Sequence, residues 1–377
     1  MSLCLLLLAL AAPAAAAPPE MERELAGVVE LFYDMQFDKA RAAADALAAR
    51  RPNHPAGAFY RGVSSYQHWT AEGMRSTDTY RAFELDSEAA ENAAKAIMGS
   101  NPAEAHYYLG ATLGFRARAN MAQKKFFRAL PDASASIKHL KKALALDPAL
   151  SDARLGMGMY HYFAARMPAG AKPLAYLLVG ESADRKLGLA ELWSVAHSTG
   201  IARMEARSVL AVILSKDDEA DWAGAETLLA ELAARYPHNP IYRLRRAYVA
   251  ERRGDFDAAV ALADPDGKWI ETLHPSVRAP ARAWALYRAA ESRLLQKRAA
   301  DTERWLVALD RLPHPRGMKD WVLLRRANLL DFQGKPREAD ELYGRIKDKT
   351  PAALAARFRT ERYPAGPKDT APFFTGY

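Results

Sequence analysis

Trp222-Ala-Gly-Ala-Glu-Thr-Leu-Leu-Ala-Glu-Leu-Ala-Ala-Arg-Tyr-Pro237 is the stretch that decides the fold of this chain. Its apolar residues recur at the three- and four-residue spacing of one helix face, and its final proline cannot continue the helix. The small residue Ala225 lies twelve residues before that proline, and an equivalent residue, Ala259, follows 34 residues after Ala225. A helical pattern with this period predicts repeated helix-turn-helix units.

The same interval between an alanine and a proline recurs along the chain. It separates residues 40 and 52, 90 and 102, and 339 and 351. The likeness extends past the proline, because Leu47–Pro55 parallels Leu232–Pro240. Each of these segments carries two prolines near its end, so each must turn the chain into a following helix. We therefore predict repeats with insertions over residues 20–150 and regular repeats over residues 205–351.

Composition also favours helices. Hydrophobic residues make up 50% of the 377 residues and charged residues 26%, so the chain can bury a large core and is not expected to be disordered. Alanine, leucine and arginine dominate, which favours helix. No stretch combines alternating β-branched residues with turn dipeptides. We expect an all-α fold.

The net charge of +8 bears on the partner. No run of five or more basic residues occurs, so nucleic acid is not an expected partner. The charge indicates either an acidic partner or anionic envelope surface, or arginines spread over solvated helix faces.

Residues 1–17 have the character of a secretory signal peptide. The apolar run Leu3–Leu10 is followed by Pro13-Ala-Ala-Ala-Ala17, whose small residues suit a signal peptidase. No Lys or Arg precedes the run, so an uncleaved anchor is the alternative. Cys4 is the only cysteine, and a mature chain would therefore have no disulfide and no cysteine-based metal site. We expect a periplasmic or secreted protein.

Residues 151–204 depart most from the repeat, because prolines and glycine at 168, 170 and 173 interrupt what should be the second helix of a pair. We expect an irregular helical middle segment here. It is rich in polar and aromatic side chains, and we predict that a ligand or partner contacts Tyr160, His161, Tyr162, Lys172, Asp184 and Arg185. The alternative is structural: Tyr and His close one helix, and Asp184 opens the next as an acidic N-terminal residue.

The C-terminal end differs again. After about Arg362 the chain turns to Pro, Gly and Thr, which do not sustain a helix. We expect residues 352–377 to form an extended tail that packs on the array or stays loose.

Small residues recur where the two helices of a pair must approach closely. They are Gly110, Gly158, Ala247 and Ala327 in first helices, and Ala40, Ala90, Ala225, Ala259 and Ala339 in second helices. In this pattern the chain resembles the tetratricopeptide-repeat family from about residue 24 to 351. The resemblance implies a right-handed superhelix, an α-solenoid whose concave groove binds proteins or peptides. It implies no catalytic residue and no cofactor.

A narrower likeness covers about residues 150–260. The residues that carry it are Gly156, Tyr160, Pro168, Lys172, Asp184, Gly188, Leu189 and Leu192. In these positions the chain is similar to the eukaryotic inclusion-body-clearance tetratricopeptide proteins. That likeness implies protein binding and assembly scaffolding, although the signal-like N-terminus argues against the same cellular setting.

The sequence carries no His-Glu-x-x-His, no phosphate-binding glycine loop and no Gly-x-Ser-x-Gly. None of the nine histidines pairs with another at a spacing of three or four residues, so no helical metal site is expected. We therefore expect no enzyme activity. We expect an exported scaffold or adaptor that binds a protein or peptide in its groove.

The alternative is a binder or carrier of an anionic lipid or glycan that uses a groove of basic and aromatic residues. A groove that is open along its length and lined by Arg and Tyr favours the peptide. A closed apolar pocket near Tyr160 favours the lipid.

Overall fold

The computed structural model describes residues 19–167, 180, 182–315, 317–363, 366 and 369–371. Within these ranges every regular element is helical and no strand occurs, which confirms the predicted all-α fold. The predicted signal peptide and Lys172 lie outside the described residues.

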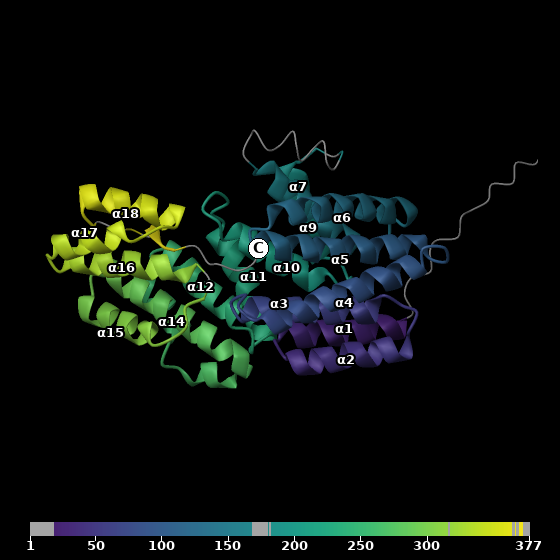
Figure 1. The fold of residues 1–377 in the computed structure, drawn as a ribbon, viewed down its shortest axis with the longest axis horizontal. Coiled ribbons are helices and arrows are strands. Elements are labelled where there is room, and N and C mark those ends of the chain that lie inside the picture. The colour runs from purple at the N-terminus through teal and green to yellow at the C-terminus, as the bar shows by residue number, and fades with distance from the viewer. Residues whose placement is uncertain are drawn as a thin grey trace, which may run out of the picture.

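Consecutive helices joined mostly by short turns make up the molecule (Figure 1). The N-terminal half contains α1 (Pro19–Tyr33), α2 (Phe37–Arg50), α3 (Ala56–Ala71), α4 (Thr77–Ala96), α5 (Pro102–Ala122), α6 (Phe126–Leu146), α7 (Ala153–Ala165), α9 (Arg185–Ala196), α10 (Arg203–Leu214) and α11 (Trp222–Arg235). The C-terminal half contains α12 (Pro240–Arg252), α13 (Phe256–Ala263), the 3-10 helix η2 (Lys268–Thr272), α14 (Pro275–Leu295), α15 (Ala299–Asp310), α16 (Met318–Phe332), α17 (Pro336–Gly344) and α18 (Lys349–Glu361).

Residues Trp222–Arg235 form α11, which ends before Pro237 as the sequence predicts. The carboxylate of Asp221 accepts a hydrogen bond of 2.9 Å from the Gly224 amide and caps the helix. Ala225 is fully buried, as a small residue at a helix–helix contact should be. Asn239 caps the next helix, α12, with its side chain.

The helices pack in two layers, as in a solenoid. Each described helix packs on the next one along the chain, and alternate helices also contact one another across the repeats. These second-neighbour contacts join α1 to α3, α3 to α5, α5 to α7, α12 to α14, α14 to α16 and α16 to α18. The alternate helices therefore form an inner layer, and their side chains line the concave side of the array.

The middle of the chain contains a close helix pair, α7 and α9. A Cβ atom added to Gly188 on α9 would lie 2.5 Å from the backbone nitrogen of Tyr162 and 2.7 Å from the carbonyl oxygen of Gly158 on α7. The prolines and glycine that interrupt the pattern fall between these two helices, outside the described residues. Within residues 151–204 the structure describes two regular helices, α7 and α9, and the start of α10.

Two hydrophobic cores hold the array together. Helices α1 to α12, apart from α6, contribute to the first, and α12 to α18 contribute to the second. α12 belongs to both, because Tyr242 and Val249 pack into the first core while Leu244 and Ala247 pack into the second. This shared helix joins the two halves.

The N-terminal half fills its own concave side. Tyr33 on α1 donates a hydrogen bond to Glu205 on α10, and Arg118 on α5 donates to the same carboxylate at 3.0 Å. The α11–α12 turn also reaches α1, since the backbone amide of His238 donates to Asp34 at 3.0 Å. Inner helices far apart in the sequence thereby meet through their own side chains.

The end of the chain differs from the expected tail. Residues 352–361, which the sequence assigns to an extended tail, are helical and belong to α18. Residues 369–371 lie beyond it and pack on the array, with 3%, 6% and 0% of their surfaces exposed. The helix continues past Pro351 because its apolar face packs into the second core through Ala355 and Phe358.

We expect Gly188→Ala to lower the free energy of unfolding by roughly 1–3 kcal/mol or more, because its methyl group would collide with backbone atoms of α7. Gly27→Ala is the matched control. A Cβ at Gly27 on α1 meets no atom within 4 Å, and alanine favours helix by about 0.5–1 kcal/mol. Urea unfolding measures both variants. A neutral Gly188→Ala would contradict the close α7–α9 contact.

Candidate functional site

Two of the six residues singled out in the sequence come together at one carboxylate. Tyr162 on α7 donates a hydrogen bond of 2.7 Å to Glu219, and the Nε atom of Arg185 on α9 donates to the same oxygen at 2.7 Å. Glu219 comes from the α10–α11 turn, and its side chain is only 5% exposed. Arg166 also pairs with Glu219 at 3.5 Å and with Asp218. Arginine neighbours and the Tyr162 hydroxyl hold the pKa of Glu219 below its ordinary value.

The other described residues of that set have structural surroundings. His161 is buried and its Nδ1 atom lies 2.6 Å from a carboxylate oxygen of Glu191, so this pair joins α7 to α9. Tyr160 packs against a small apolar cluster at α6 and α7. Asp184 caps α9 by accepting hydrogen bonds from two amides in the first turn of that helix, including that of Lys186 at 2.8 Å. As a ligand site, the set stays a prediction.

Lys216 adds a cation that the sequence reasoning overlooked. Its Nζ atom lies 4.6 Å from the centre of the Phe163 ring. Burial, followed by the nearby charges of Arg166 and Arg245, lowers the pKa of Lys216 to about 8. The ammonium group of Lys216 therefore loses its proton more readily than that of a solvated lysine.

Four buried charges meet on the inner helices of the C-terminal half. Arg288 on α14 bonds to Glu251 on α12 at 2.6 Å and to Glu291 at 2.8 Å, and Arg325 on α16 bonds to Glu291 at 2.7 Å. All four side chains are at most 1% exposed. We call them the buried quartet. Its two positive and two negative groups compensate one another, as charges removed from water must.

The buried quartet binds the backbone of residues 369–371. Arg288 donates to the carbonyl oxygen of Ala371 at 2.6 Å, and the amide of Ala371 donates to Glu291 at 3.0 Å. Arg325 donates to the carbonyl oxygen of Asp369. Buried backbone groups need such partners, and here side chains of α14 and α16 supply them in place of a helix or a sheet.

Side chains of the same segment have partners as well. The carboxylate of Asp369 accepts a hydrogen bond of 2.8 Å from Arg357 on α18, and its other oxygen accepts one of 2.9 Å from the Gly366 amide. Arg252 on α12 lies 3.3 Å from the hydroxyl of Thr370. The segment is therefore held by three successive inner helices and by α18.

Aromatic rings hold the two arginines in place. The guanidinium of Arg288 lies 5.1 to 5.6 Å from the ring centres of Tyr248, Trp284 and Tyr287, and that of Arg325 lies 5.8 Å from Trp321. Cation–π contacts of this kind keep a buried guanidinium oriented. Burial, together with the neighbouring Glu291 carboxylate, raises the pKa of Glu251 to about 7 despite the contact with Arg288.

A signal for the buried quartet is present in the sequence. Trp284-x-x-x-Arg288 recurs 37 residues later as Trp321-x-x-x-Arg325, and Glu251 lies 37 residues before Arg288. The three charged residues thus take one position in three successive inner helices. Sequence reasoning missed them because charged residues on helices are usually solvated.

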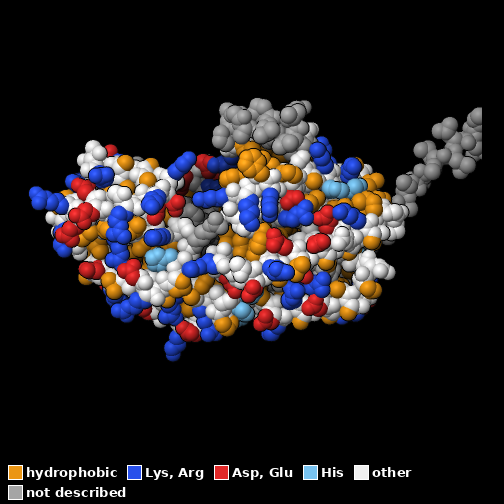
Figure 2. All heavy atoms as spheres, in the orientation of Figure 1, with side chains coloured by type: hydrophobic (Ala, Val, Ile, Leu, Met, Phe, Trp, Pro, Cys, Tyr) orange, Lys and Arg blue, Asp and Glu red, His pale blue; other side chains and the backbone are white. Residues whose placement is uncertain are grey.

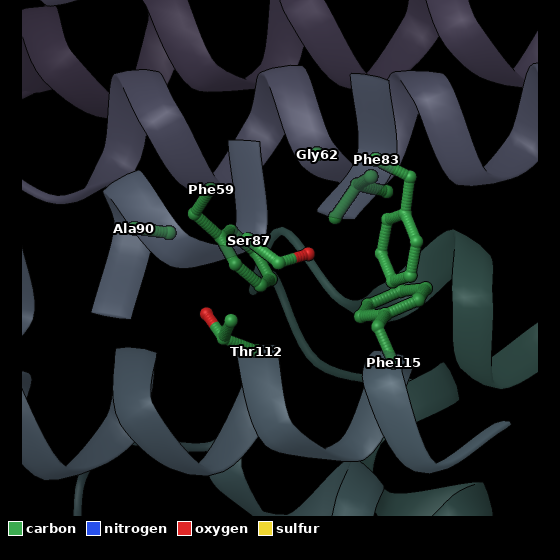
Figure 3. Close-up of a pocket in the computed structure, with 8 residues that line it drawn as sticks. Phe59, Gly62, Phe83, Ser87, Ala90, Thr112 and Phe115 are labelled. Carbon is green, nitrogen blue, oxygen red and sulfur yellow. The ribbon is translucent and has the colours of Figure 1, made fainter. Parts of the chain in front are cut away.

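A small pocket lies between α3, α4 and α5, away from Tyr160 (Figure 3). The aromatic rings of Phe59, Phe83 and Phe115 line it. Its volume is about 10 Å³, which is no more than a single water molecule needs. This pocket cannot hold a lipid chain.

Two histidines that are far apart in the sequence meet on α5 and α6. The Nδ1 atoms of His106 and His139 lie 2.7 Å apart. Burial and the charge of Lys142 lower the pKa of both rings, and the His106 ring lowers the pKa of His139 further. Among the described residues, no group of three or more His, Cys, Asp or Glu side chains is arranged to hold a metal ion.

No protein-family model matches the chain, and a search of curated proteins finds no relative. Among solved structures, the chain matches one described as the structure of Naa15/Naa10 bound to HypK-THB. The two chains share 13% identity, over 92% of this chain and 69% of that one, with a TM-score of 0.23. So low a score carries no argument, and the fold assignment rests on the helices themselves.

We expect Arg325→Ala to lower the free energy of unfolding by roughly 3–5 kcal/mol, because it leaves Glu291 buried with one cation fewer. Arg304→Ala is the matched control. It removes an ion pair to Asp266 whose side chains are 63% and 67% exposed, and should cost less than about 1 kcal/mol. Denaturant unfolding followed by circular dichroism measures both. Equal losses would show that the buried quartet does not stabilise the C-terminal half.

We expect the free energy of unfolding to rise as the pH increases from about 8 to 10.5. These limits are the pKa of Lys216 in the folded chain and its ordinary value. In this range the unfolded chain binds more protons at this side chain than the folded chain does. Lys216→Met should remove part of the rise, and Lys138→Met, at an exposed position on α6, should retain it. Urea midpoints at several pH values test this. Identical slopes for the two variants would contradict it.

Proposed function

We propose that this protein is a non-catalytic scaffold or adaptor of the tetratricopeptide-repeat kind, which binds a short segment of a partner protein on the inner face of α12, α14 and α16. One observation carries the proposal. That face already holds residues 369–371, and it does so through the backbone of the segment as well as its side chains.

Recognition of this kind suits a peptide. Backbone groups occur in every partner, so the bonds from Arg288, Arg325 and Glu291 supply affinity for any segment that takes the same path. The buried quartet is fixed by its own ion pairs and rings. A partner would therefore not have to order these side chains on binding, which reduces the entropy cost.

An anionic lipid or glycan is the alternative partner. The observation that favours it is that the cationic side chains of Lys216, Arg166 and Arg245 lie near one another. Against it, the face shown in Figure 2 has Lys and Arg side chains interspersed with Asp and Glu, without a continuous basic surface. A peptide partner accounts for the contacts that this face makes with the C-terminal segment, and we therefore prefer it.

We also propose that the protein is exported to the periplasm or secreted. The support is the apolar run Leu3–Leu10 with the small residues that follow it. In the part of the chain that the structure describes, no helix is both long and apolar enough to cross a membrane. The narrower likeness to inclusion-body-clearance proteins supports a role in protein binding and not this location.

Peptide binding can be tested on the full-length chain. The protein carries Asp369→Ala and Ala371→Leu to weaken its own segment, and the probe is a fluorescent peptide with the sequence of residues 363–377. We expect saturable binding by fluorescence anisotropy, weakened at least about tenfold by a further Arg357→Ala, which removes one contact to Asp369. Arg304→Ala, far more exposed, is the control.

If the folded variant, checked by circular dichroism, does not bind the peptide, this face is not a peptide site. If the same protein binds vesicles that contain an anionic lipid and not the peptide, the alternative partner replaces the proposed one.

A further inference from the structure

We infer that this face selects its partner by a short code, an acidic residue followed two positions later by alanine, and that Asp369–Ala371 is the chain's own copy of that ligand. The inference rests on the proposed function and adds the chemistry of the partner. It also makes the C-terminal segment an intramolecular competitor, which a partner must displace.

The acidic position is defined by two contacts and by burial. The side chain of Asp369 is 4% exposed, and Arg357 is its ion-pair partner at 2.8 Å. Its second carboxylate oxygen accepts the hydrogen bond from the Gly366 amide. An amide or an apolar side chain at this position would lose the ion pair and leave Arg357 less well compensated.

The alanine position is defined by the lack of space for a larger side chain. Ala371 is fully buried and is part of the second hydrophobic core. Both of its backbone groups are already bonded, to Arg288 and to Glu291, so the residue cannot move away to make room. A larger side chain would have to displace packed core residues, which costs energy wherever interiors are close-packed.

The position between the acidic residue and the alanine tolerates more kinds of side chain. Thr370 is 6% exposed and its hydroxyl lies 3.3 Å from Arg252, which in turn pairs with Asp217 at 2.6 Å. The side chain of Asp217 is 61% exposed, so this end of the site borders solvent. A small polar residue fits here, and the code is acidic, then small and polar, then alanine.

The C-terminal segment competes with a partner because it is tethered to the site. A segment on the same chain binds at an effective concentration in the millimolar range when its linker is short. Only the residues between Glu361, the end of α18, and Asp369 separate the segment from the array. A partner that carries the same code must therefore exceed this internal concentration or bind other surfaces as well.

The code is tested with three labelled peptides that have the sequence of residues 363–377, one unchanged, one with Asp369→Asn and one with Ala371→Leu. They are titrated into the full-length chain that carries Asp369→Ala and Ala371→Leu. We expect each substituted peptide to bind at least about tenfold more weakly than the unchanged one. Equal binding of all three overturns the code while the proposed function stands. Binding of none overturns the proposed function.

Competition is tested on a chain whose own segment is otherwise intact, in case the doubly substituted chain is unfolded. Thr370→Cys is introduced together with Cys4→Ser, so that position 370 carries the only thiol. We expect slow labelling by a maleimide, accelerated at least about tenfold by an excess of the unchanged peptide but not of the Ala371→Leu peptide. Rapid labelling without peptide, or no acceleration, overturns the inference.

A second copy of the chain is the other source of the same segment. Light scattering on the unmodified full-length protein separates the two cases. A monomer supports the intramolecular assignment. A dimer that dissociates when the unchanged peptide is added would show that the segment comes from another copy, and would overturn that assignment.

Discussion

The C-terminal half depends on the compensation of four buried charges. Arg288, Arg325, Glu251 and Glu291 lie on three inner helices with almost no contact with water. Removing an ion from water costs several kcal/mol, and the cost is offset only when pairing and hydrogen bonding are nearly complete. The segment 369–371 contributes to this balance, because it supplies two carbonyl acceptors and one amide donor. The segment therefore adds hydrogen bonds to four charges that already compensate one another.

The concave side is filled differently in the two halves. In the N-terminal half, Tyr33, Arg118 and Glu205 connect three inner helices directly, so the inner face is occupied by the array itself. In the C-terminal half the corresponding place is taken by a peptide segment. Both solutions pair an arginine with a buried glutamate. Only the second involves a chain segment that could come from elsewhere, which is why we propose that a partner binds there.

Much of the fold could be predicted from the sequence, whereas the contacts that assemble the site could not. The interval from Ala225 to Pro237 locates helix pairs because a close helix contact needs a small residue and a helix end needs a breaker. Helix α18 was missed, since its burial depends on the second core rather than on the repeat pattern. Tyr162 and Arg185 meet only because the α10–α11 turn places Glu219 between them. Such convergence of distant segments leaves no local signal.

Hydrogen exchange at the amide of Ala371 is the measurement that tests the account most directly, because this amide donates to a buried carboxylate of Glu291. In the native full-length chain we predict exchange slower by several orders of magnitude than in a free peptide of the same sequence, with protection lost as a matching peptide is added in excess. Exchange at the free-peptide rate in the native chain would show that the segment is not bound, and would contradict the account.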